Sequence, residues 1–394
     1  MRRIHRQLVD SLHITGTNEG DGVTSLELFF DLVYVFAFTQ VTTLISHGRA
    51  PGSLVDGFIV LSLLWWSWCS FAWLANQARA DEGVLRATFV VALIAVFIAC
   101  LALPDAFHDV PGALNSAGVV VACYTVVRLT HAGAYLVAAG PDARLRRQVV
   151  VTVLASLLPT VALLVAGAVA GQPEQRVLWL VAVLYDFAAV FVTANTSRGW
   201  VVQSAAHFAE RHGLVVILAL GESIVAIAAG LGNAHLSWRI VVGAVLSILI
   251  AVGLYFAYFG RLVERLEQAI DVVQGRARAK LATDLFTYLH FPIIAGVILS
   301  ALGVERAMGH LPDDHFGALG GWTLGAGVAL FLAGTAATVL RAYGEWSVPR
   351  IGAALLLVAV SPLLTVVDPL TAVGIVAVVV LALAVVESAR VAVE

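Results

Sequence analysis

SLELFFDLVYVFAFTQVT, residues 25–42, combines an apolar run of membrane-spanning character with two acidic side chains. Glu27 and Asp31 are four residues apart, so on a helix they share one face and lie one turn from each other. A carboxylate near the centre of a bilayer costs about 3 kcal/mol on insertion scales. We therefore expect both carboxylates to point into a bundle of helices and to find partners there.

The whole chain has the same apolar character. Of its 394 residues, 60% are hydrophobic and 12% are charged, and the mean hydropathy is +0.93. A soluble domain carries about 25% charged residues. The apolar runs are continuous and of helix length, which indicates helices rather than the alternating strands of a barrel. We predict an all-α, polytopic transmembrane helical bundle, and the net charge of −3 argues against a nucleic-acid partner.

Because a helical crossing needs roughly 20 apolar residues, we predict about twelve spans. They lie near residues 26–46, 55–75, 86–103, 114–138, 149–171, 177–195, 207–230, 237–260, 284–304, 317–340, 349–367 and 370–388. Asp368 and Pro369 alone separate the last two spans, which form either a tight hairpin or one broken helix.

The basic residues predict the orientation of these spans. Most of the 23 Lys and Arg residues fall in the N-terminal segment and in the loops after even-numbered spans. The opposite loops hold only Arg49, Arg176, Arg239 and Arg306. By the positive-inside rule both termini are cytoplasmic. The first apolar stretch carries two acids and no cleavage site, so we interpret it as a span and not as a removed signal peptide.

A faint internal repeat relates the two halves of the chain. Gln40 lies 13 residues after Glu27 in the first span, and Glu222 lies 12 residues after Glu210 in the seventh. The second and eighth spans are both rich in aromatic residues. After six spans the chain is back on the side of the membrane where it started, so two six-span repeats would have the same orientation and be parallel. We predict a cytoplasmic segment 1–25, a first six-helix repeat 26–195, and a second repeat 196–394 with a cytoplasmic loop near 261–283.

The segment HFAERHGLVVILALGES, residues 207–223, carries a second polar cluster. His207, Glu210 and Arg211 share one helix face, and Glu222 returns to nearly the azimuth of Arg211. One interpretation is a polar path that faces the acids of the first span. The other is that the first residues of the segment only cap the cytoplasmic end of the helix. Glu222 lies too deep for a short acid to reach the headgroups.

Arg128 and His131 share a face of the fourth span. A buried arginine needs a carboxylate, and Asp31, Asp186 or Glu222 could supply it. Arg128 is then either a structural counter-ion or a substrate or gating residue. His131 is either a titratable switch near neutral pH or a satisfied core histidine.

Asp186 and His290 are further candidates for a pathway or binding role. Asp186 lies in the middle of the sixth span, and His290 lies in the first turns of the ninth, beside Pro292. The three cysteines fall in apolar runs without metal-ligand spacing, so we interpret them as small core residues. The order H-x-x-E-R-H at 207–212 is not a zinc-protease pattern, so we expect no metal site.

Two segments resemble a known family. LELFFDLVYVFAFTQV (26–41) and HFAERHGLVVILALGESI (207–224) are similar to the signatures of the bacterial low temperature requirement A (LtrA) family. WWSWCSFAWLANQ (65–77) and YLHFPIIAG (288–296) are similar to further family features. The resemblance implies a multipass protein of the bacterial inner membrane that is linked to growth in the cold. The family's polar positions correspond to Glu27, Asp31, Gln40, Glu210, Arg211, His212 and Glu222.

A looser similarity concerns ELFFD at 27–31. It is similar to the E-x-F-S-D motif in the first helix of each six-helix repeat of a potassium and proton channel family. Phe30 stands in place of the serine, and the arginine that precedes the motif in that family is absent.

Three functions remain open from the sequence. The first is a channel or transporter for a cation or proton, with Glu27, Asp31 and Glu222 as pathway carboxylates and Arg128 and Arg211 as counter-ions. The second is a membrane enzyme acting on a lipid or isoprenoid, although DDxxD, GxSxG and histidine-box motifs are absent. The third is a structural or regulatory membrane protein. We assign no catalytic residue and expect no cofactor. The expected partners are the lipid bilayer and a small ion or lipid substrate, and a homo-oligomer is left open.

Overall fold

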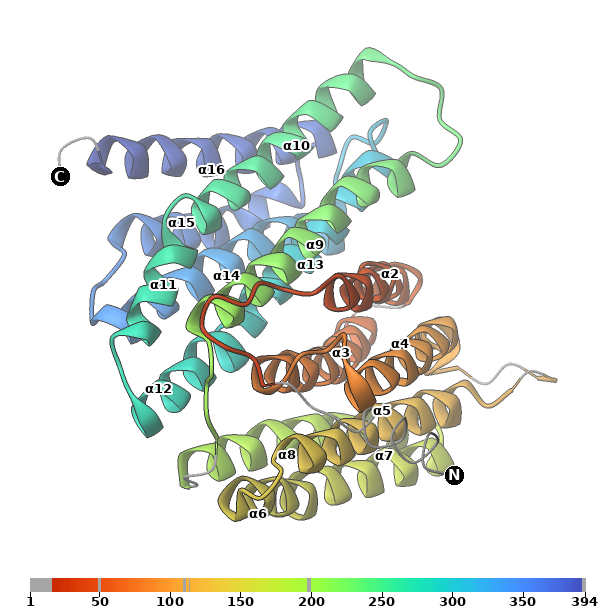
Figure 1. Ribbon diagram of the computed structural model, residues 1–394. Coiled ribbons are helices and arrows are strands. Elements are labelled where there is room, and N and C mark those ends of the chain that lie inside the picture. The colour runs from red at the N-terminus through yellow and green to blue at the C-terminus, as the bar shows by residue number, and fades with distance from the viewer. Residues whose placement is uncertain (1–15, 49–50, 109–110, 113, 197–199, 392–394) are drawn as a thin grey trace. The chain divides into compact units, whose positions relative to one another are not determined.

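The computed structural model describes residues 16–48, 51–108, 111–112, 114–196 and 200–391 (Figure 1). Every regular element within these ranges is a helix, which confirms the prediction of an all-α bundle. Of the basic residues in the orientation argument, Arg2, Arg3, Arg6, Arg49 and Arg198 lie outside the described ranges. The predicted N-terminal segment 1–25 is described from residue 16 onward.

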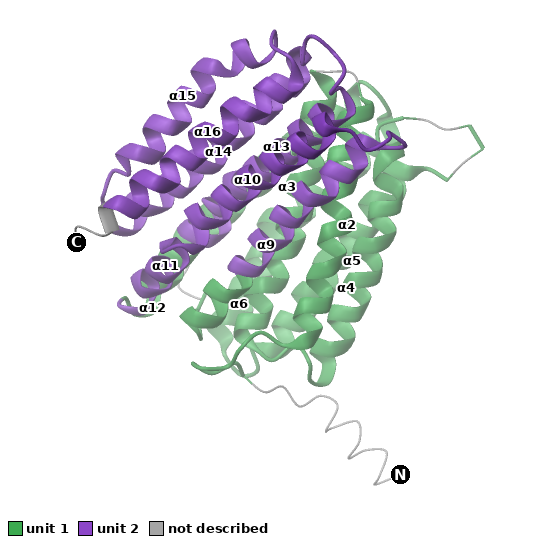
Figure 2. Ribbon diagram, turned by 90° about the horizontal axis from the view of Figure 1, so that it is seen from above, with its two compact units in different colours: residues 1–211, 273–283 green, residues 212–272, 284–394 purple. Residues whose placement is uncertain are grey.

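The chain divides into two compact units, which Figure 2 shows in two colours. Unit 1 comprises residues 1–211 and 273–283, and unit 2 comprises residues 212–272 and 284–394. Unit 1 therefore also holds the beginning of the seventh span and the segment 273–283. The division into two six-helix repeats stays a prediction.

Unit 1 contains six long helical segments, one of which is divided by a π-helical turn. Its elements are α2 (Ser25–His47), α3 (Gly52–Gln77), α4 (Gly83–Ala102), η1 (Leu103–Asp105), α5 (Ser116–Ala138), α6 (Ala143–Thr152), the π-helical η2 (Val153–Leu157), α7 (Leu158–Ala170), α8 (Glu174–Thr196), the first residues of α9 (Ala205–Leu231) and α12 (Gly275–Ala282).

Unit 2 contains the remainder of α9 and the C-terminal helices. Its further elements are α10 (Trp238–Phe259), α11 (Leu262–Asp271), the π-helical η3 (Thr283–Tyr288), which starts at the boundary of the units, α13 (His290–Gly309), α14 (Gly317–Tyr343), α15 (Val348–Leu364) and α16 (Pro369–Val391).

Eleven helical segments of the described chain are long and apolar enough to cross a membrane. The exception among the twelve predicted spans is 349–367, where α15 has 17 residues and ends at Leu364. Beyond this end, the carbonyls of Thr365 and Val367 accept the N–H groups of Gly317 and Phe316 instead of continuing the helix. The turn before Pro369 makes α15 and α16 two separate helices that pack together. The protein is thus a multipass membrane protein.

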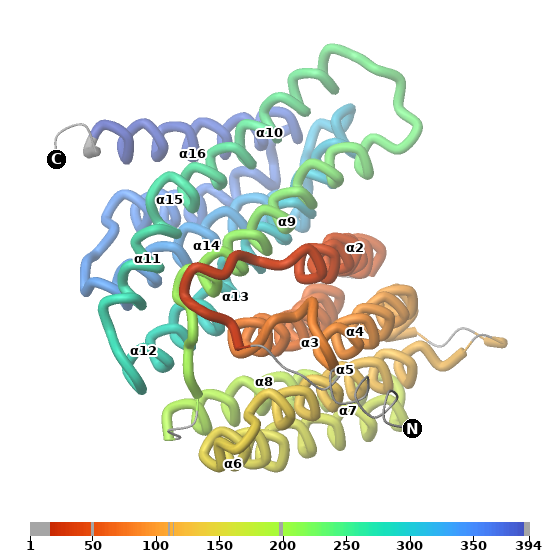
Figure 3. The backbone as a smooth tube through the Cα atoms, viewed as in Figure 1, coloured from red at the N-terminus to blue at the C-terminus, as the bar shows by residue number. Residues whose placement is uncertain are grey.

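Within unit 1, α2 packs on α3 and α4, and α3 also contacts α5 and α8. Figure 3 colours these helices from red at α2 to yellow-green at α8. The core between these helices is aromatic. The Phe30 ring lies 5.0 Å from that of Phe71 and 5.2 Å from that of Phe89. Cys69 and Cys100 are buried free thiols in this core, as the sequence predicts. The tight packing gives α2 one fully covered face.

Unit 2 is built around the close approach of α13 and α14. A Cβ atom added to Gly303 would lie 2.6 Å from Leu324, and one added to Gly296 would lie 2.4 Å from the backbone nitrogen of Phe331. Glycine is therefore required at both positions for the backbones to come this near. Outside this pair, α14 packs on α15, and α10 packs on α16.

Candidate functional site

The beginning of α2 fixes one carboxylate of the site. Thr24 is the N-cap residue, and its hydroxyl oxygen accepts the backbone N–H of Glu27 at 3.3 Å. In return, Glu27 Oε1 accepts the Thr24 N–H at 3.1 Å and the Thr24 hydroxyl at 2.8 Å. This capping box satisfies backbone donors of the first turn. It also occupies one oxygen of Glu27 and leaves Oε2 for other partners.

The beginning of α9 is held against the end of α3 in a similar way. Ser204 Oγ accepts the backbone N–H of His207 at 3.1 Å. Asn76, on α3, donates to the Ser204 carbonyl at 2.7 Å and accepts the Gln203 N–H at 2.8 Å. These bonds set the position of the first turn of α9 relative to α3, and so the direction of His207.

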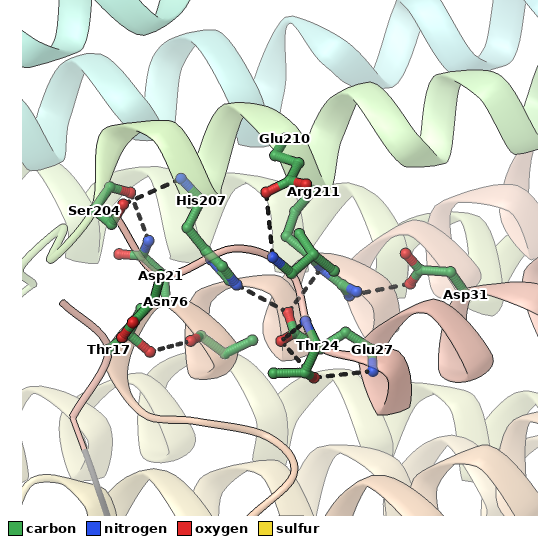
Figure 4. A network of polar contacts seen from close by, with 12 residues as sticks. Thr17, Asp21, Thr24, Glu27, Asp31, Asn76, Ser204, His207, Glu210 and Arg211 are labelled. Carbon is green, nitrogen blue, oxygen red and sulfur yellow. Dashed lines mark hydrogen bonds and ion pairs between the residues drawn. The ribbon is translucent and has the colours of Figure 1, made fainter. Parts of the chain in front are cut away.

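Side chains from α2, α3 and α9 meet in a buried group, which Figure 4 shows. Glu27 Oε2 lies 3.1 Å from His207 Nε2 and 3.4 Å from Arg211 Nε. Arg211 Nη2 lies 3.0 Å from Asp31 Oδ1, which also accepts the Trp68 indole N–H at 2.9 Å. We call Glu27, Asp31, His207 and Arg211 the carboxylate cluster. The two predicted acids therefore do point inward, and two of the predicted polar residues of the seventh span, His207 and Arg211, face them.

The carboxylate cluster is shielded from solvent and lipid. Its side chains are between 0% and 2% exposed. The His207 side chain is therefore packed inside unit 1 and does not extend toward the headgroups. Within the described residues, Asp31 Oδ2, Arg211 Nη1 and His207 Nδ1 have no hydrogen-bond partner. Each of these three atoms can form a further hydrogen bond.

The charges of the carboxylate cluster do not balance. Two carboxylates share one guanidinium, so the cluster carries one formal negative charge while His207 is neutral. It becomes neutral when the imidazole is protonated. Since an uncompensated buried charge is costly, the arrangement favours the uptake of one positive charge.

Glu210 does not join the cluster, contrary to the expectation that it shares the polar face. Its side chain is exposed, and Oε2 accepts the backbone N–H of Val23 at 3.2 Å. The reason is geometric, since neighbouring residues on a helix point about 100° apart and Arg211 occupies the inward direction.

We call residues 16–24 the N-terminal arm. Thr17 also anchors it, by donating to the Ala75 carbonyl at 2.8 Å.

A second buried charge pair joins α5 and α8. Arg128 Nη1 lies 3.2 Å from Asp186 Oδ2, which identifies Asp186 among the three carboxylates considered from the sequence. Tyr124 donates to the same oxygen at 3.1 Å, and its own hydroxyl oxygen accepts from Arg128 Nη1 at 2.9 Å. Ser156, in the π-helical η2, donates to Asp186 Oδ1. Here one cation meets one anion, and both oxygens of Asp186 are hydrogen-bonded.

Two other predicted residues of unit 1 lie apart from these groups of contacts. His131 is half-buried, hydrogen-bonded to the Ser70 backbone, and its ring centroid lies 5.9 Å from that of Phe71 and 5.5 Å from that of Tyr135. Gln40 is half-buried near the end of α2. Neither position adds a charge to the site.

Two predicted residues, Glu222 and His290, belong to unit 2 and are buried there. His290 Nδ1 lies 2.8 Å from the Leu285 carbonyl, so this nitrogen must donate. Its Nε2 then accepts the Tyr258 hydroxyl at 2.7 Å. The ring of His212 lies 5.3 Å from that of His290. His290 thus has both nitrogens bonded, as a core histidine does.

Several residues of the two groups went unnoticed in the sequence. Thr24 was detectable, because T-x-x-E before an apolar run is the signature of a capping box. Trp68, Tyr124 and Ser156 were not, because one indole, phenol or hydroxyl among many apolar residues has no distinguishing pattern. No three His, Cys, Asp or Glu side chains of the described residues come together in a way that could hold a metal ion.

Comparison with known proteins places this architecture in a family. Residues 22–385 match the family model of the bacterial low temperature requirement A protein (LtrA). The chain belongs to the LtrA family. An uncharacterized protein of Rhizobium meliloti (strain 1021) is 27% identical to this LtrA chain over 331 residues, which cover 78% of the chain and 75% of the relative. No solved structure matches the chain.

Proposed function

We propose that this LtrA-family protein conducts or transports a proton or another small cation across the bacterial inner membrane, and that Glu27 and Asp31 receive the ion. The observation that carries this proposal is the surplus of one carboxylate over guanidinium in a cluster that is at most 2% exposed. A permanent surplus charge in this setting is destabilising. The surplus negative charge is explained if the site alternately accepts and releases a cation.

A purely structural role accounts less well for the carboxylate cluster. Charges that only hold helices together are expected to balance, as Arg128 and Asp186 do in the same unit. Removing one acid from the cluster would leave a balanced pair, so the second acid is dispensable for structure. Its presence supports a role in binding a cation.

The N-terminal arm gives the proposed pathway a covered end. It leads into α2 and is held to the end of α3 by the Thr17–Ala75 hydrogen bond and to the beginning of α9 by Glu210. We propose that this end and both chain termini are cytoplasmic, as the distribution of basic residues favours. An ion that reaches the cluster from the cytoplasm would then have to pass the arm.

The enzyme alternative requires an apolar substrate cavity beside the acids. A cavity of about 30 Å³ lies between α3, α4 and α5 and is lined mainly by aliphatic side chains such as Val60, Leu64 and Val96. Its polar lining residues include Ser67 and Tyr124, and no member of the carboxylate cluster is among its walls. This cavity therefore does not bring a lipid substrate to Glu27 or Asp31.

Flux measurements on the purified protein in liposomes test the proposal. We expect the wild type to carry protons, potassium or sodium down an imposed gradient. Asp31→Asn should lower this flux about tenfold or more, because it removes the surplus carboxylate and leaves Glu27 and Arg211 as a balanced pair that has no charge to offer the ion. Asp314→Asn, an exposed loop position, is the matched control and should leave the flux unchanged. Wild-type vesicles that pass none of these ions would refute the proposal.

A further inference from the structure

We infer that the ion is a proton and that its binding site is the His207–Glu27 pair, with Arg211 as a fixed counter-charge. This inference rests on the proposed function and names its substrate. It distinguishes a proton from the metal cations, which make different demands on a site. The distances and the hydrogen-bond partners of the four cluster side chains decide between them.

A metal cation would find too few ligands in the carboxylate cluster. Hard cations bind several oxygen atoms at once, six to eight for Ca²⁺ and six for Mg²⁺. Glu27 Oε1 is occupied by Thr24, and Glu27 Oε2 faces His207 and Arg211. Asp31 Oδ1 faces Arg211 and accepts from Trp68. Within the described residues Glu27 Oε2 and Asp31 Oδ2 have no hydrogen-bond partner, but Glu27 Oε2 is already in ion-pair contact with His207 and Arg211, so Asp31 Oδ2 is the carboxylate oxygen that lies outside these contacts.

The guanidinium adds a second obstacle to a metal cation. Arg211 nitrogen atoms lie 3.0 Å from Asp31 and 3.4 Å from Glu27, so a second cation at these carboxylates would be close to a fixed positive charge. Two unit charges at about 4 Å repel by roughly 4 kcal/mol in a partly buried site. A dehydrated metal ion would receive little in return, because one free oxygen cannot replace its hydration shell.

A proton needs none of these ligands. It requires one donor–acceptor pair at hydrogen-bond distance, and His207 Nε2 lies 3.1 Å from Glu27 Oε2. When the imidazole takes up a proton, the formal charge of the cluster changes from minus one to zero, and when it releases the proton the charge returns. Imidazole is the side chain best suited to such exchange near neutral pH.

The two nitrogens of His207 have different surroundings, which suits a relay. Nε2 faces Glu27, whereas Nδ1 has no hydrogen-bond partner within the described residues. A proton can therefore arrive at Nδ1 while the proton on Nε2 passes to Glu27 Oε2. The ring then holds its single remaining proton on Nδ1 and must turn or exchange it before the next cycle.

The groups that face this pair come from three helices. Besides Glu27, α2 contributes Asp31 and, on the same face one turn further, the buried Tyr34, whose hydroxyl has no hydrogen-bond partner within the described chain. Trp68 of α3 donates to Asp31, and Arg211 of α9 contacts both acids. Asp31 and Tyr34 are thus the next polar groups along α2 from the proton site.

Proton flux without metal cations tests the inference. Wild-type protein is reconstituted in liposomes with a fluorescent pH indicator inside; potassium and sodium are replaced on both sides by N-methylglucamine, and a membrane-permeant anion is present to balance the charge that the protons carry. We expect the pH change driven by an imposed proton gradient to persist. Flux that stops in N-methylglucamine and returns with potassium or sodium would overturn the inference and leave the proposed function standing. Vesicles that carry no ion at all would refute both.

Substitution of the histidine identifies the site. His207→Gln keeps an N–H group that can donate to Glu27 but cannot hold an exchangeable proton, so it should lower proton flux about a hundredfold. The control is His47→Gln, at the exposed end of α2, which should behave as the wild type. Undiminished proton flux in a folded His207→Gln protein would overturn the assignment of the site. The metal-free measurement uses the wild type alone, so it decides the ion even if this variant does not fold.

Discussion

The carboxylate cluster of α2 and α9 and the Arg128–Asp186 pair of α5 and α8 both bury charge in unit 1, but they balance it differently. In the pair, one guanidinium meets one carboxylate, and Tyr124 and Ser156 complete the hydrogen bonds of Asp186. In the cluster, one guanidinium serves two carboxylates, and some polar atoms have no hydrogen-bond partner within the described residues. A closed set of partners is suited to holding helices together. An open, unbalanced set is suited to taking up a charge.

Unit 2 contains further balanced pairs. Arg350 of α15 contacts both oxygens of Glu387 on α16, at 2.6 and 3.1 Å. Arg341 contacts Asp284 at 2.6 Å. These pairs are more exposed than the cluster, so an unpaired charge at these positions would cost little free energy. The surplus carboxylate therefore occurs where burial makes it most costly.

Arg211→Gln should have the largest effect on stability. It leaves Glu27 and Asp31 buried without a cation, and breaking a buried ion pair costs about 3–5 kcal/mol. Since two acids lose their partner, we expect a loss of about 5 kcal/mol or more in the free energy of unfolding at pH 8, measured in detergent. Acidification should recover part of it, because protonation neutralises both carboxylates. Stability that does not depend on pH in this variant would contradict the charge assignment.

The same substitution at two buried aspartates compares the two regions directly. Asp186→Asn leaves Arg128 without a counter-charge and should cost about 3–5 kcal/mol. Asp31→Asn leaves Glu27 to balance Arg211, and its amide oxygen can still accept from Trp68, so we expect a loss of about 1 kcal/mol or less. Thermal and denaturant unfolding of both variants under identical conditions gives the two values.

A double variant checks that charge causes this difference. Arg128→Met combined with Asp186→Leu removes both charges of the pair and should recover most of the stability lost in Asp186→Asn, since apolar replacement of a buried ion pair is often neutral. If Asp31→Asn and Asp186→Asn were equally destabilising, the distinction between an unbalanced cluster and a balanced pair would have no energetic basis.

Replacing the indole donor of the cluster should have an intermediate effect. Trp68→Phe removes the hydrogen bond to the Asp31 carboxylate and should cost about 2 kcal/mol, because bonds to charged groups contribute more than neutral ones. Trp179→Phe is the matched control in the same unit, since its indole donates to the neutral Leu164 carbonyl at 2.9 Å. We expect a smaller hydrogen-bond loss of about 1 kcal/mol there. A double-mutant cycle of Trp68→Phe with Asp31→Asn separates this bond from the change in packing.

The residues of the two groups differ in how far the sequence predicts their positions. The spacing of Glu27 and Asp31 in an apolar run was sufficient to predict that both point inward, because lipid is no alternative for a carboxylate. A buried Arg128 also needs a carboxylate partner. The sequence does not show which helices are neighbours, so it does not distinguish Asp186 from Asp31 and Glu222 as that partner. The positions of Glu210 and Arg211 differ for a similar reason. Adjacent charges look equivalent in a sequence, and only the packing of α9 directs one inward.

The capping box at Thr24 gives the smallest expected effect and links the cluster to the helix that carries it. Thr24→Ala should cost about 1 kcal/mol, as the loss of an N-cap side chain usually does. Ser237→Ala removes the equivalent cap of α10, where Ser237 Oγ accepts the Ile240 N–H, and should cost a similar amount. Thr24→Ala additionally removes the hydroxyl that holds Glu27 Oε1, so it should also lower proton flux, whereas Ser237→Ala should not. Thr24→Ser, which keeps the hydroxyl, should restore both properties. Equal flux in the two alanine variants would show that the capping box stabilises α2 without orienting the carboxylate that faces His207.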